Sequence, residues 1–527
     1  MKRKATFQCT IYIVVLLGLF TFLADCGRDE AAPADPSTTS VIPDIVFFNT
    51  VDPSAVILFE GRATDNTRVQ TVLLSFNNGA VWHTADIDNT SPNTLWNVEW
   101  SYLASAADIP ATMNTVLLRA LDGDANEVTS SPIPLEKQSG AGVSNLEAVF
   151  SGAVDGQVIA LSSGIGGAYG DSVTALTIPI DVDLTVLGSG YGSTVTSGGL
   201  EPLADPVATI LEADPATASL FSVDADLILK NIRLLGAESA IRISDNGGSD
   251  PQLSVEECLF DKQAAWAVFA EDDNGVVSVE VAVSIVDASQ ADSSSRGGIY
   301  LNNVSYSVDG SAIYFQTDPG GPTDSSVQGA GVQAFEGTGE ITETVFDDNA
   351  LAIWASGGSP VITSCDILGT ASTTNGINLT GGPGEALIRR NTIDGNTGYG
   401  LRVGGEMDLV LRKNAITNNG LSGVLIDSDL DNPSLANINM GTSTDKGNNL
   451  LDDNDHPNGI GGIETQVYVT QATQEGSTWI PANWNYWGYV DPTEVDFAGV
   501  DNGENGGGRA TLAIGNFWPS INSEVGP

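Results

Sequence analysis

Leu411 to Asn419 has the sequence L-R-K-N-A-I-T-N-N, and Ile388 to Asn396 has the closely similar sequence I-R-R-N-T-I-D-G-N. In both, an apolar residue is followed three places later by Asn, two places later by an apolar anchor, and three places later by Asn again. The same pattern recurs in looser form between about Leu227 and Ile426. Its eight predicted anchors, 21 to 33 residues apart, are Leu234, Phe260, Ile285, Ile313, Phe346, Ile367, Ile393 and Ile416.

After each anchor comes a second short apolar segment of the type Gly/Ala-apolar-x-apolar, as in Gly298 to Leu301 and Gly376 to Leu379. A repeat of this length is one supersecondary unit that cannot bury its apolar face alone. The strands are too short for a sandwich, and no helical pattern lies between them. Stacking the units gives parallel strands around one apolar interior, so we predict an all-β chain whose main part, residues 136–434, is a right-handed parallel β-helix.

The composition fits a turn-rich β architecture, because 59 of the 527 residues are Gly and only 17% are charged. The charge is very unbalanced, with 20 Lys and Arg against 67 Asp and Glu and a formal net charge of −47. Such a surface repels phosphate backbones, which excludes nucleic acid as a partner. It also opposes polyanionic polysaccharides unless a cation or a local basic patch intervenes.

Four cysteines are present, and two of them, Cys9 and Cys26, lie in the leader. Cys258 and Cys365 each precede an anchor by two places. Equivalent positions four coils apart are separated by roughly 19 Å at the usual strand spacing, far beyond the reach of a disulfide. We therefore expect two separate buried thiols.

Residues 1–26 have a basic start and a short apolar run, as an export signal does. The run ends in Leu23-Ala24-Asp25-Cys26, which resembles a bacterial lipobox, with Asp25 where a small residue is usual. The resemblance implies lipidation at Cys26 and an outer-membrane lipoprotein at the cell surface or the periplasmic face; an ordinary secretory leader is the alternative. Residues 27–43 are predicted to be a flexible tether.

Residues 44–135 change to alternating strands separated by turns. The segments Gly61 to Asn66 and Arg119 to Asn126 resemble those of bacterial Ig-like surface modules. The resemblance implies a β-sandwich that serves as a spacer or an adhesion module. His83 follows Trp82 with no evident partner, and we expect it to be structural.

Two further segments resemble known β-helix proteins. Residues 155–161 and 183–190 resemble the opening turns of pectate-lyase-like β-helices. Residues 437–441, 447–450 and 483–488 resemble the end of bacterial β-helix proteins of unassigned function. We therefore predict that residues 435–527 form the last coils and a Trp-rich cap. The aromatic residues there either plug the last coil or stack on sugar rings, and they are Trp479, Trp484, Trp487 and Trp518.

The best candidate site is basic. Stacking would place four cations on neighbouring coils about 5 Å apart, and a fifth lies on the same two turns: Arg389, Arg390, Arg412, Lys413 and Arg402. Like charges this close repel, so we expect anions beside them. These anions are either an acidic sugar or sulfate held by the guanidinium groups, or the protein's own Asp394, Glu406 and Asp408.

Asn391 and Asn414 both stand two places before an anchor, where earlier coils have Ile232, Cys258 or Val283. We expect an inward ladder in which each amide bonds the next amide and the backbone of the bend.

A calcium site is predicted from the alternating carboxylates Asp427, Asp429 and Asp431. A solvated loop is the alternative, since Asn432 and Ile438 occupy the places of the Gly and the Glu of an EF-hand loop.

Many enzymes of this fold act on polysaccharides, but fold alone does not imply an activity. The sequence lacks a recognisable hydrolase cluster of Asp and His. A lyase needs an Arg or Lys base beside a uronate neutralised by calcium, and Arg389, Arg390 or Lys413 could serve.

We therefore predict a non-catalytic, lipid-anchored surface protein for adhesion, glycan binding or envelope structure, with a polysaccharide or a host or neighbouring cell surface as its partner. The binding surface would be the exposed parallel sheets and the long loops 287–296 and 316–328. A polysaccharide lyase or glycoside hydrolase acting on an acidic polysaccharide is the alternative.

Overall fold

A computed structural model of the chain describes two β modules, which the following residues make up. They are residues 40–48, 56–64, 69–87, 97–105, 108, 115–123, 126–138, 146, 150–161, 169–170, 173, 175–188, 193–196, 199–202, 209–244, 250–287, 297–314, 329–369, 375–427, 438–454, 467–469, 478–482, 485–486 and 510–513. Within them no helix is long and apolar enough to cross a bilayer.

The N-terminal module consists of two antiparallel sheets. One sheet has the order β1 (Ser40–Phe48), β2 (Val56–Thr64), β6 (Asn97–Ser105), β5 (Asp86–Ile87). The other has the order β4 (His83–Thr84), β3 (Val69–Ser75), β7 (Thr115–Asp122), β9 (Ile133–Gln138), with β8 (Glu127–Thr129) beside β7. Side chains from both sheets share one core, which includes Phe59, Trp100, Leu74 and Leu118. The first strand begins four residues before the predicted start of the module, and the last ends three residues beyond its predicted end.

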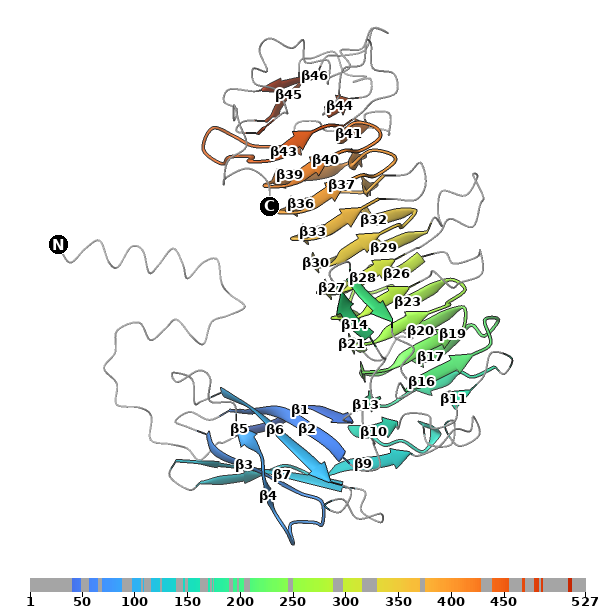
Figure 1. Cartoon of the computed structure of the whole chain (residues 1–527), viewed down its shortest axis with the longest axis vertical. Coiled ribbons are helices and arrows are strands. Elements are labelled where there is room, and N and C mark those ends of the chain that lie inside the picture. The colour runs from blue at the N-terminus through green and yellow to red at the C-terminus, as the bar shows by residue number, and fades with distance from the viewer. Residues whose placement is uncertain are drawn as a thin grey trace, which may run out of the picture.

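The second module is a parallel β-helix of three sheets, and Figure 1 shows its strands stacked along a rod. Each complete coil adds one strand to sheet 1, then one to sheet 2, then one to sheet 3. The strands of sheet 1 are β10 (Gln157–Leu161), β13 (Leu184–Leu187), β18 (Leu227–Lys230), β21 (Gln252–Glu256), β24 (Ser278–Ala282), β27 (Ser305–Asp309), β30 (Thr338–Thr342), β33 (Ser359–Thr363), β36 (Gly384–Arg389), β39 (Met407–Arg412) and β42 (Ile438–Asn439).

Sheets 2 and 3 each contain 11 strands. Sheet 2 is β11 (Tyr169–Gly170), β16 (Ile210–Ala213), β19 (Arg233–Gly236), β22 (Leu259–Asp261), β25 (Ile285–Asp287), β28 (Ala312–Tyr314), β31 (Val345–Asp347), β34 (Asp366–Leu368), β37 (Thr392–Asp394), β40 (Ala415–Thr417) and β43 (Leu450–Asp452). Sheet 3 is β12 (Ile178–Ile180), β17 (Ser219–Val223), β20 (Ser239–Ser244), β23 (Trp266–Glu271), β26 (Gly297–Asn302), β29 (Ala330–Phe335), β32 (Leu351–Ser356), β35 (Ile377–Thr380), β38 (Leu401–Gly404), β41 (Val424–Asp427) and β44 (Val467–Val469). The pairs β14 (Ser193–Thr196) with β15 (Gly199–Pro202) and β45 (Thr478–Pro481) with β46 (Ala510–Ala513) stand apart.

The two modules share a sheet. Strand β9 of the sandwich pairs in parallel with β10, the first strand of sheet 1, from Leu135↔Val158 onward. Val158 and Leu187 of the β-helix belong to the core cluster of the sandwich. Next to this junction, Leu146 and Phe150 lie in helical residues and are buried in the core of the rod. Strand and helix together therefore cover the N-terminal end of the coil.

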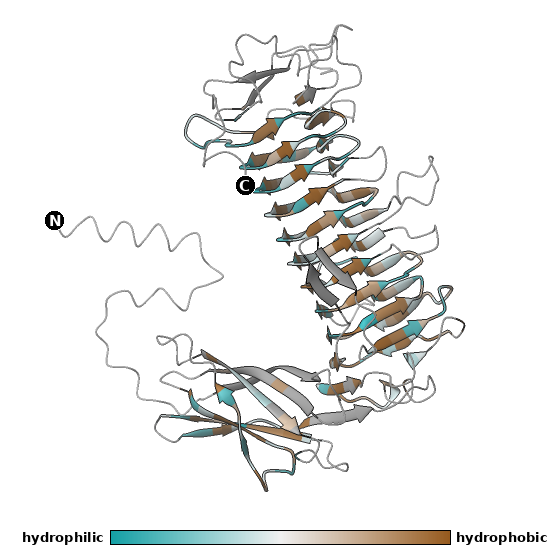
Figure 2. Cartoon of the chain, in the orientation of Figure 1, coloured by the Kyte–Doolittle hydropathy of each residue, from teal (hydrophilic) through white to brown (hydrophobic). Residues whose placement is uncertain are grey.

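Alternate residues of each strand point into the rod. These inward residues are mostly aliphatic and form one core. Figure 2 shows the apolar colour recurring on strand after strand along the rod. Seven of the eight predicted anchors lie in one register column of sheet 2; Leu234, for instance, pairs with Phe260. The prediction of Ile285 is wrong by one residue, since Val286 pairs with Phe260 and Ile313. Ile285 packs instead in a separate outer cluster with Leu259, Ala312 and Tyr314.

A ladder of inward polar residues lines the bend between sheets 1 and 2. The amide Nδ2 of Asn391 donates to Oδ1 of Asn414 at 3.0 Å, and Nδ2 of Asn414 donates to Oδ1 of Asn449 at 3.0 Å. The amide Nδ2 of Asn449 donates in turn to Oδ1 of Asn485 at 2.8 Å. These bonds confirm the predicted ladder. In the third predicted repeat the ladder residue is Ser284, not Val283, which has a φ of 47° and is exposed.

Cys258 and Cys365 occupy earlier rungs of this ladder, and both are free and buried. They precede β22 and β34, which are four coils apart in sheet 2. Burial raises the pKa of each thiol to about 12. The prediction of two separate buried thiols is confirmed.

We expect Asn391→Ala to lower the free energy of unfolding by about 3 kcal/mol, because several buried polar groups lose their partners at about 1–3 kcal/mol each. Asn391 bonds the N–H of Cys365 at 2.9 Å and the carbonyl of Ile362 at 2.9 Å as well as Asn414. Urea unfolding measures the loss. Ser359→Ala, at an exposed residue of β33, is the control and should change stability by less than about 0.5 kcal/mol. Equal stability of the two variants would contradict a stabilising ladder.

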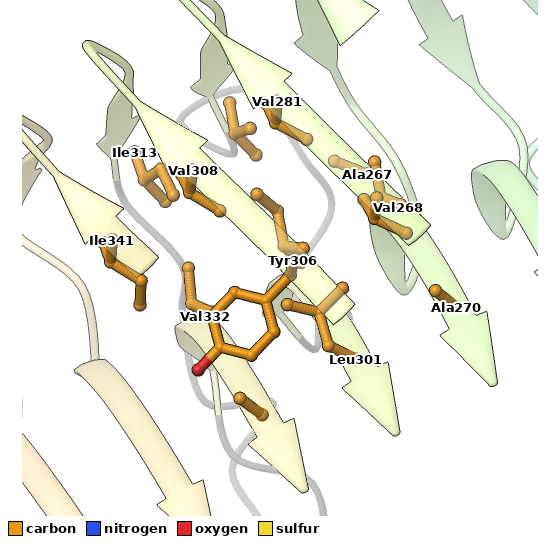
Figure 3. Close-up of a cluster of buried hydrophobic side chains, with 14 of the residues drawn as sticks. Ala267, Val268, Ala270, Val281, Leu301, Tyr306, Val308, Ile313, Val332 and Ile341 are labelled. Carbon is orange, nitrogen blue, oxygen red and sulfur yellow. The ribbon is translucent and has the colours of Figure 1, made fainter. Parts of the chain in front are cut away.

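Tyr306 points into the rod from sheet 1 (Figure 3) and lies against Gly339 of the next coil. Its hydroxyl is buried and has no hydrogen-bond partner among the described residues. An unpaired buried hydroxyl costs about 1–3 kcal/mol. Tyr306→Phe should therefore raise the free energy of unfolding by about 1 kcal/mol in the same urea assay, and a lower stability would show that the hydroxyl is bonded in solution.

Candidate functional site

One register column runs along the outer face of sheet 3. Its members follow one another as neighbours on successive coils, and they are Arg242, Phe269, Tyr300, Gln333, Trp354, Asn378 and Arg402. We call this column the sheet-3 strip. The residues on either side of each member face the core; Val268 and Ala270, for example, are buried beside Phe269. The strict alternation of a β-strand therefore turns the members of the strip outward, and all of them except Gln333, which is fully buried, keep an exposed part.

Aromatic rings dominate the first half of the strip. The rings of Phe269 and Tyr300 are stacked with centroids 4.7 Å apart and an interplanar angle of 5°. The guanidinium of Arg242 lies over the ring of Phe269, with its carbon 4.8 Å from the ring centroid. Phe335, in the adjacent column, contacts Tyr300 at 5.7 Å and Trp354 at 5.3 Å. The contacts make one continuous aromatic surface over four coils.

Polar groups fix and continue this surface. The indole Nε1 of Trp354 donates to Oγ1 of Thr380 on the next coil at 2.9 Å, which holds the ring in place. Asn378 follows Trp354 in register and accepts a hydrogen bond from Nδ2 of Asn375 at 2.7 Å. Arg402 follows Asn378. The strip therefore passes from rings to an amide and then to a guanidinium.

The strip contains two arginines and no carboxylate, although the chain has 67 Asp and Glu. Glu271, in the next column, is the nearest acid in register to the aromatic part. Burial, and then the charge of Glu271, raise the pKa of the Tyr300 hydroxyl, so this group stays neutral at physiological pH. The strip is thus a track of low negative charge on a rod that is otherwise strongly acidic.

The outer face of sheet 2 is acidic, unlike that of sheet 3. One column on its outer face includes five aspartates in the same register: Asp261, Asp287, Asp347, Asp394 and Asp452. Burial, together with the neighbouring Asp348, raises the pKa of Asp347. Burial and Asp453 do the same at Asp452. Acids are therefore concentrated on sheet 2 and rings on sheet 3.

The predicted basic residues divide into two places. Arg389 and Arg412 are register neighbours at the ends of β36 and β39. Arg390 and Lys413 follow them at the bend into sheet 2, where both have positive φ, 59° and 56°. Arg402 lies on sheet 3, before β39 begins, so it belongs to the strip and not to the group of four.

Arg412 is buried and uses its guanidinium inside the protein. Its Nε and Nη2 donate to Oδ2 of Asp445 at 2.9 and 2.6 Å. Its Nη1 donates to the carbonyls of Leu411 and Asn439 at 2.9 and 2.8 Å, and Nη2 also donates to Oδ1 of Asn439 at 2.9 Å. These five bonds occupy the N–H donors of the guanidinium group. Arg412 therefore has a structural role within the group of four.

Of the anionic residues expected beside the cations, Asp394 has other partners. Oδ1 of Asp394 accepts from Thr417 at 2.6 Å and from Asn418 at 2.7 Å. Among the described ion pairs none includes Asp394, Glu406 or Asp408. Arg389, Arg390 and Lys413 are likewise absent from those pairs.

Several predicted sites lie outside the described residues. They are the lipidation site Cys26, the calcium ligands Asp429 and Asp431 and the side chain of Asp427, the loops after Asp287 and Tyr314, and Trp484, Trp487 and Trp518. Within the described part of the chain, no group of three or more His, Cys, Asp or Glu could hold a metal ion. His83 bonds the Tyr102 hydroxyl at 2.9 Å within an aromatic cluster of the sandwich, as a structural histidine does.

The aromatic part of the strip is not among the predicted sites, although the sequence contains a signal for it. In the pattern Gly/Ala-apolar-x-apolar, x is the outward residue between two buried ones. That position holds Phe269, Tyr300 and Trp354 on three of the coils. Large aromatic residues at an outward position of successive repeats are the pattern that identifies such a surface.

A family model described as "Right handed beta helix region" matches residues 275–449. This agrees with the predicted right-handed β-helix. No curated protein matches the sequence.

Two solved structures are similar to this chain at low identity. The periplasmic alginate epimerase AlgG shares 11% identity over 73% of this chain and 85% of its own, with a TM-score of 0.27. The catalytic domain of a GH87 α-1,3-glucanase in complex with nigerose shares 10% identity over 91% of this chain and 89% of its own, with a TM-score of 0.27. Likeness at this level indicates nothing about the chemistry of this chain.

We expect Arg412→Gln to lower the free energy of unfolding by about 2 kcal/mol, because it leaves buried carbonyl oxygens without donors. Asp445→Asn should cost less than about 1 kcal/mol, since Asp445 is 67% exposed and its pair is screened by solvent. Urea unfolding of both single variants and of the double variant measures the coupling. A larger loss for Asp445→Asn than for Arg412→Gln would contradict this account.

Proposed function

We propose that the protein is exported, anchored to the outer membrane through lipid on Cys26, and binds glycans without cleaving them. The observation that carries this proposal is the sheet-3 strip, an outward aromatic and polar surface repeated coil after coil. Adhesion to a polysaccharide or to a host or neighbouring cell surface is the role that such binding would serve.

The side chains of the strip match the chemistry of a sugar. Aromatic rings offer apolar surface to the C–H groups of a pyranose. Amides such as that of Asn378 both donate and accept, as sugar hydroxyls require. The guanidinium of Arg402 suits a carboxylate or another oxyanion substituent. Since the strip contains no acid of its own, it would also accept a sugar that carries negative charge.

The length of the strip suits an oligosaccharide. The strip extends over seven successive coils, and the side chain of each member except the buried Gln333 is at least partly exposed. Neighbouring parallel strands lie about 4.8 Å apart, which makes the strip roughly 29 Å long. A ligand of several sugar units could contact rings and polar groups at once.

We further propose that the N-terminal module is an Ig-like spacer. Its strand order supports this: with β4 as the extra strand C′, β1-β2-β6-β5 corresponds to the A-B-E-D sheet of an Ig-like sandwich and β4-β3-β7-β9 to its C′-C-F-G sheet. The module begins at Ser40, within the last residues predicted as the tether 27–43, so it would lie between the lipid and the rod.

We expect Trp354→Ala to weaken glycan binding by roughly 30-fold, or about 2 kcal/mol, as the loss of a central aromatic contact does. A glycan array probed with the exported chain identifies the ligand, and titration calorimetry then measures the affinity. Trp82→Ala is the matched control, because Trp82 lies in the sandwich under Arg119 and should leave affinity unchanged.

The alternative, a polysaccharide lyase or hydrolase, is tested in the same preparation. Uronate polymers are incubated with the protein and calcium, and new unsaturated or reducing ends are measured. Cleavage that disappears in Arg390→Ala would establish the enzyme and overturn the binding proposal. An array that stays blank at low and at physiological salt would leave a structural role only.

A further inference from the structure

The bend between sheets 1 and 2 forms a ridge along the rod, and the cations on this ridge are of two kinds. Four of them have partners: Lys230 pairs with Glu256, Arg233 with Asp261 and Arg412 with Asp445, and Lys446 also makes an interaction. The other three, Arg389, Arg390 and Lys413, have no ion pair or side-chain hydrogen bond among the described residues. The unpaired cations are adjacent on two neighbouring coils.

Hydrogen bonds hold their backbone on adjacent coils, while the side chains of Arg389 and Arg390 are exposed. The N–H of Arg390 donates to the carbonyl of Arg412 at 3.1 Å, and the N–H of Lys413 donates to that of Gly447 at 2.8 Å. Coils are spaced by about 4.8 Å, where two like charges repel by roughly 1 kcal/mol in water and more near a protein surface. An anion placed between them would relieve this repulsion.

Carboxylates are abundant in this chain, yet they do not serve these three residues. The neighbouring coil places the neutral Thr363 in register with Arg389. Asp445 is engaged by Arg412, and Asp394 accepts from Thr417 and Asn418. With 67 acids against 20 bases, three adjacent unpaired cations are the exception on this ridge.

From this geometry we infer that Arg389, Arg390 and Lys413 form a second binding site, which holds one oxyanion group, a sulfate or carboxylate, carried by a glycan. Guanidinium groups bind such planar or tetrahedral oxyanions through paired N–H bonds, and the ammonium adds a point charge. A single group fits better than a polyanion, because the net charge of −47 repels long anionic chains.

The site is separate from the sheet-3 strip. The strip ends at Arg402 in β38, whereas the ridge lies beyond the far ends of β36 and β39, and each of these sheet-1 strands is six residues long. Six extended residues span about 20 Å. The two sites are therefore tested independently, and either can fail alone.

The test compares a sulfated disaccharide with its unsulfated counterpart and with sodium sulfate, using calorimetry on the exported chain. We expect the sulfated sugar to bind about ten-fold more tightly than either of the other two. The double variant Arg389→Gln/Arg390→Gln should remove this ten-fold advantage, and Lys413→Gln should reduce it. Higher salt should weaken the binding of the sulfated sugar.

Lys262→Gln is the matched control, since Lys262 is an exposed lysine, also with positive φ, on another bend of the rod. It should leave the advantage intact. Thermal unfolding checks that each variant is folded. Equal binding of the sulfated and unsulfated sugars, or the same loss in Lys262→Gln, would overturn the site. Sodium sulfate binding as tightly as the sulfated sugar would overturn the glycan as its ligand.

Discussion

The structure depends on the parallel hydrogen-bond register between successive coils. Strands as short as three residues, such as β22 and β37, have little stability alone, and they persist because each one pairs with a neighbour above and below it. That register repeats every side-chain position about every 4.8 Å along the rod. A column is therefore a functional unit: aliphatic columns make the core, an amide column makes the ladder, and aromatic and acidic columns make two different outer faces.

The sequence predicts this architecture well, because the inward columns obey a simple pattern. Apolar anchors and the Asn rungs recur at fixed offsets, so the coil and the ladder follow from them directly. The error at Ile285 arises because Val286 is equally apolar and β-branched; only Ser284, donating and accepting as a rung, fixes the register. The predicted end of the sandwich, residue 135, falls three residues short because β9 continues to Gln138 to pair with β10 of the β-helix.

The candidate sites were harder to predict, because outward positions have no common chemistry from coil to coil. The basic group was found from sequence since its members are adjacent in the repeat. The sequence does not predict that Arg412 differs from the other three cations of the group. Its partner, Asp445, lies 33 positions later, in a part of the chain where the repeat is blurred. The strip is hard to predict from the sequence because Gln333 interrupts its column of aromatic rings. The rings form a continuous surface only through Phe335, which lies in the adjacent column.

The strand shared by the two modules limits how this protein can be rearranged by recombination. A sandwich exchanged for an unrelated module would leave the backbone N–H and C=O groups of β10 bare, and bare strand edges recruit other chains. A replacement would have to bring an edge strand of matching length and direction, together with apolar side chains to receive Val158 and Leu187. The pair is therefore expected to be inherited as one unit, while coils in the middle of the rod can be gained or lost singly.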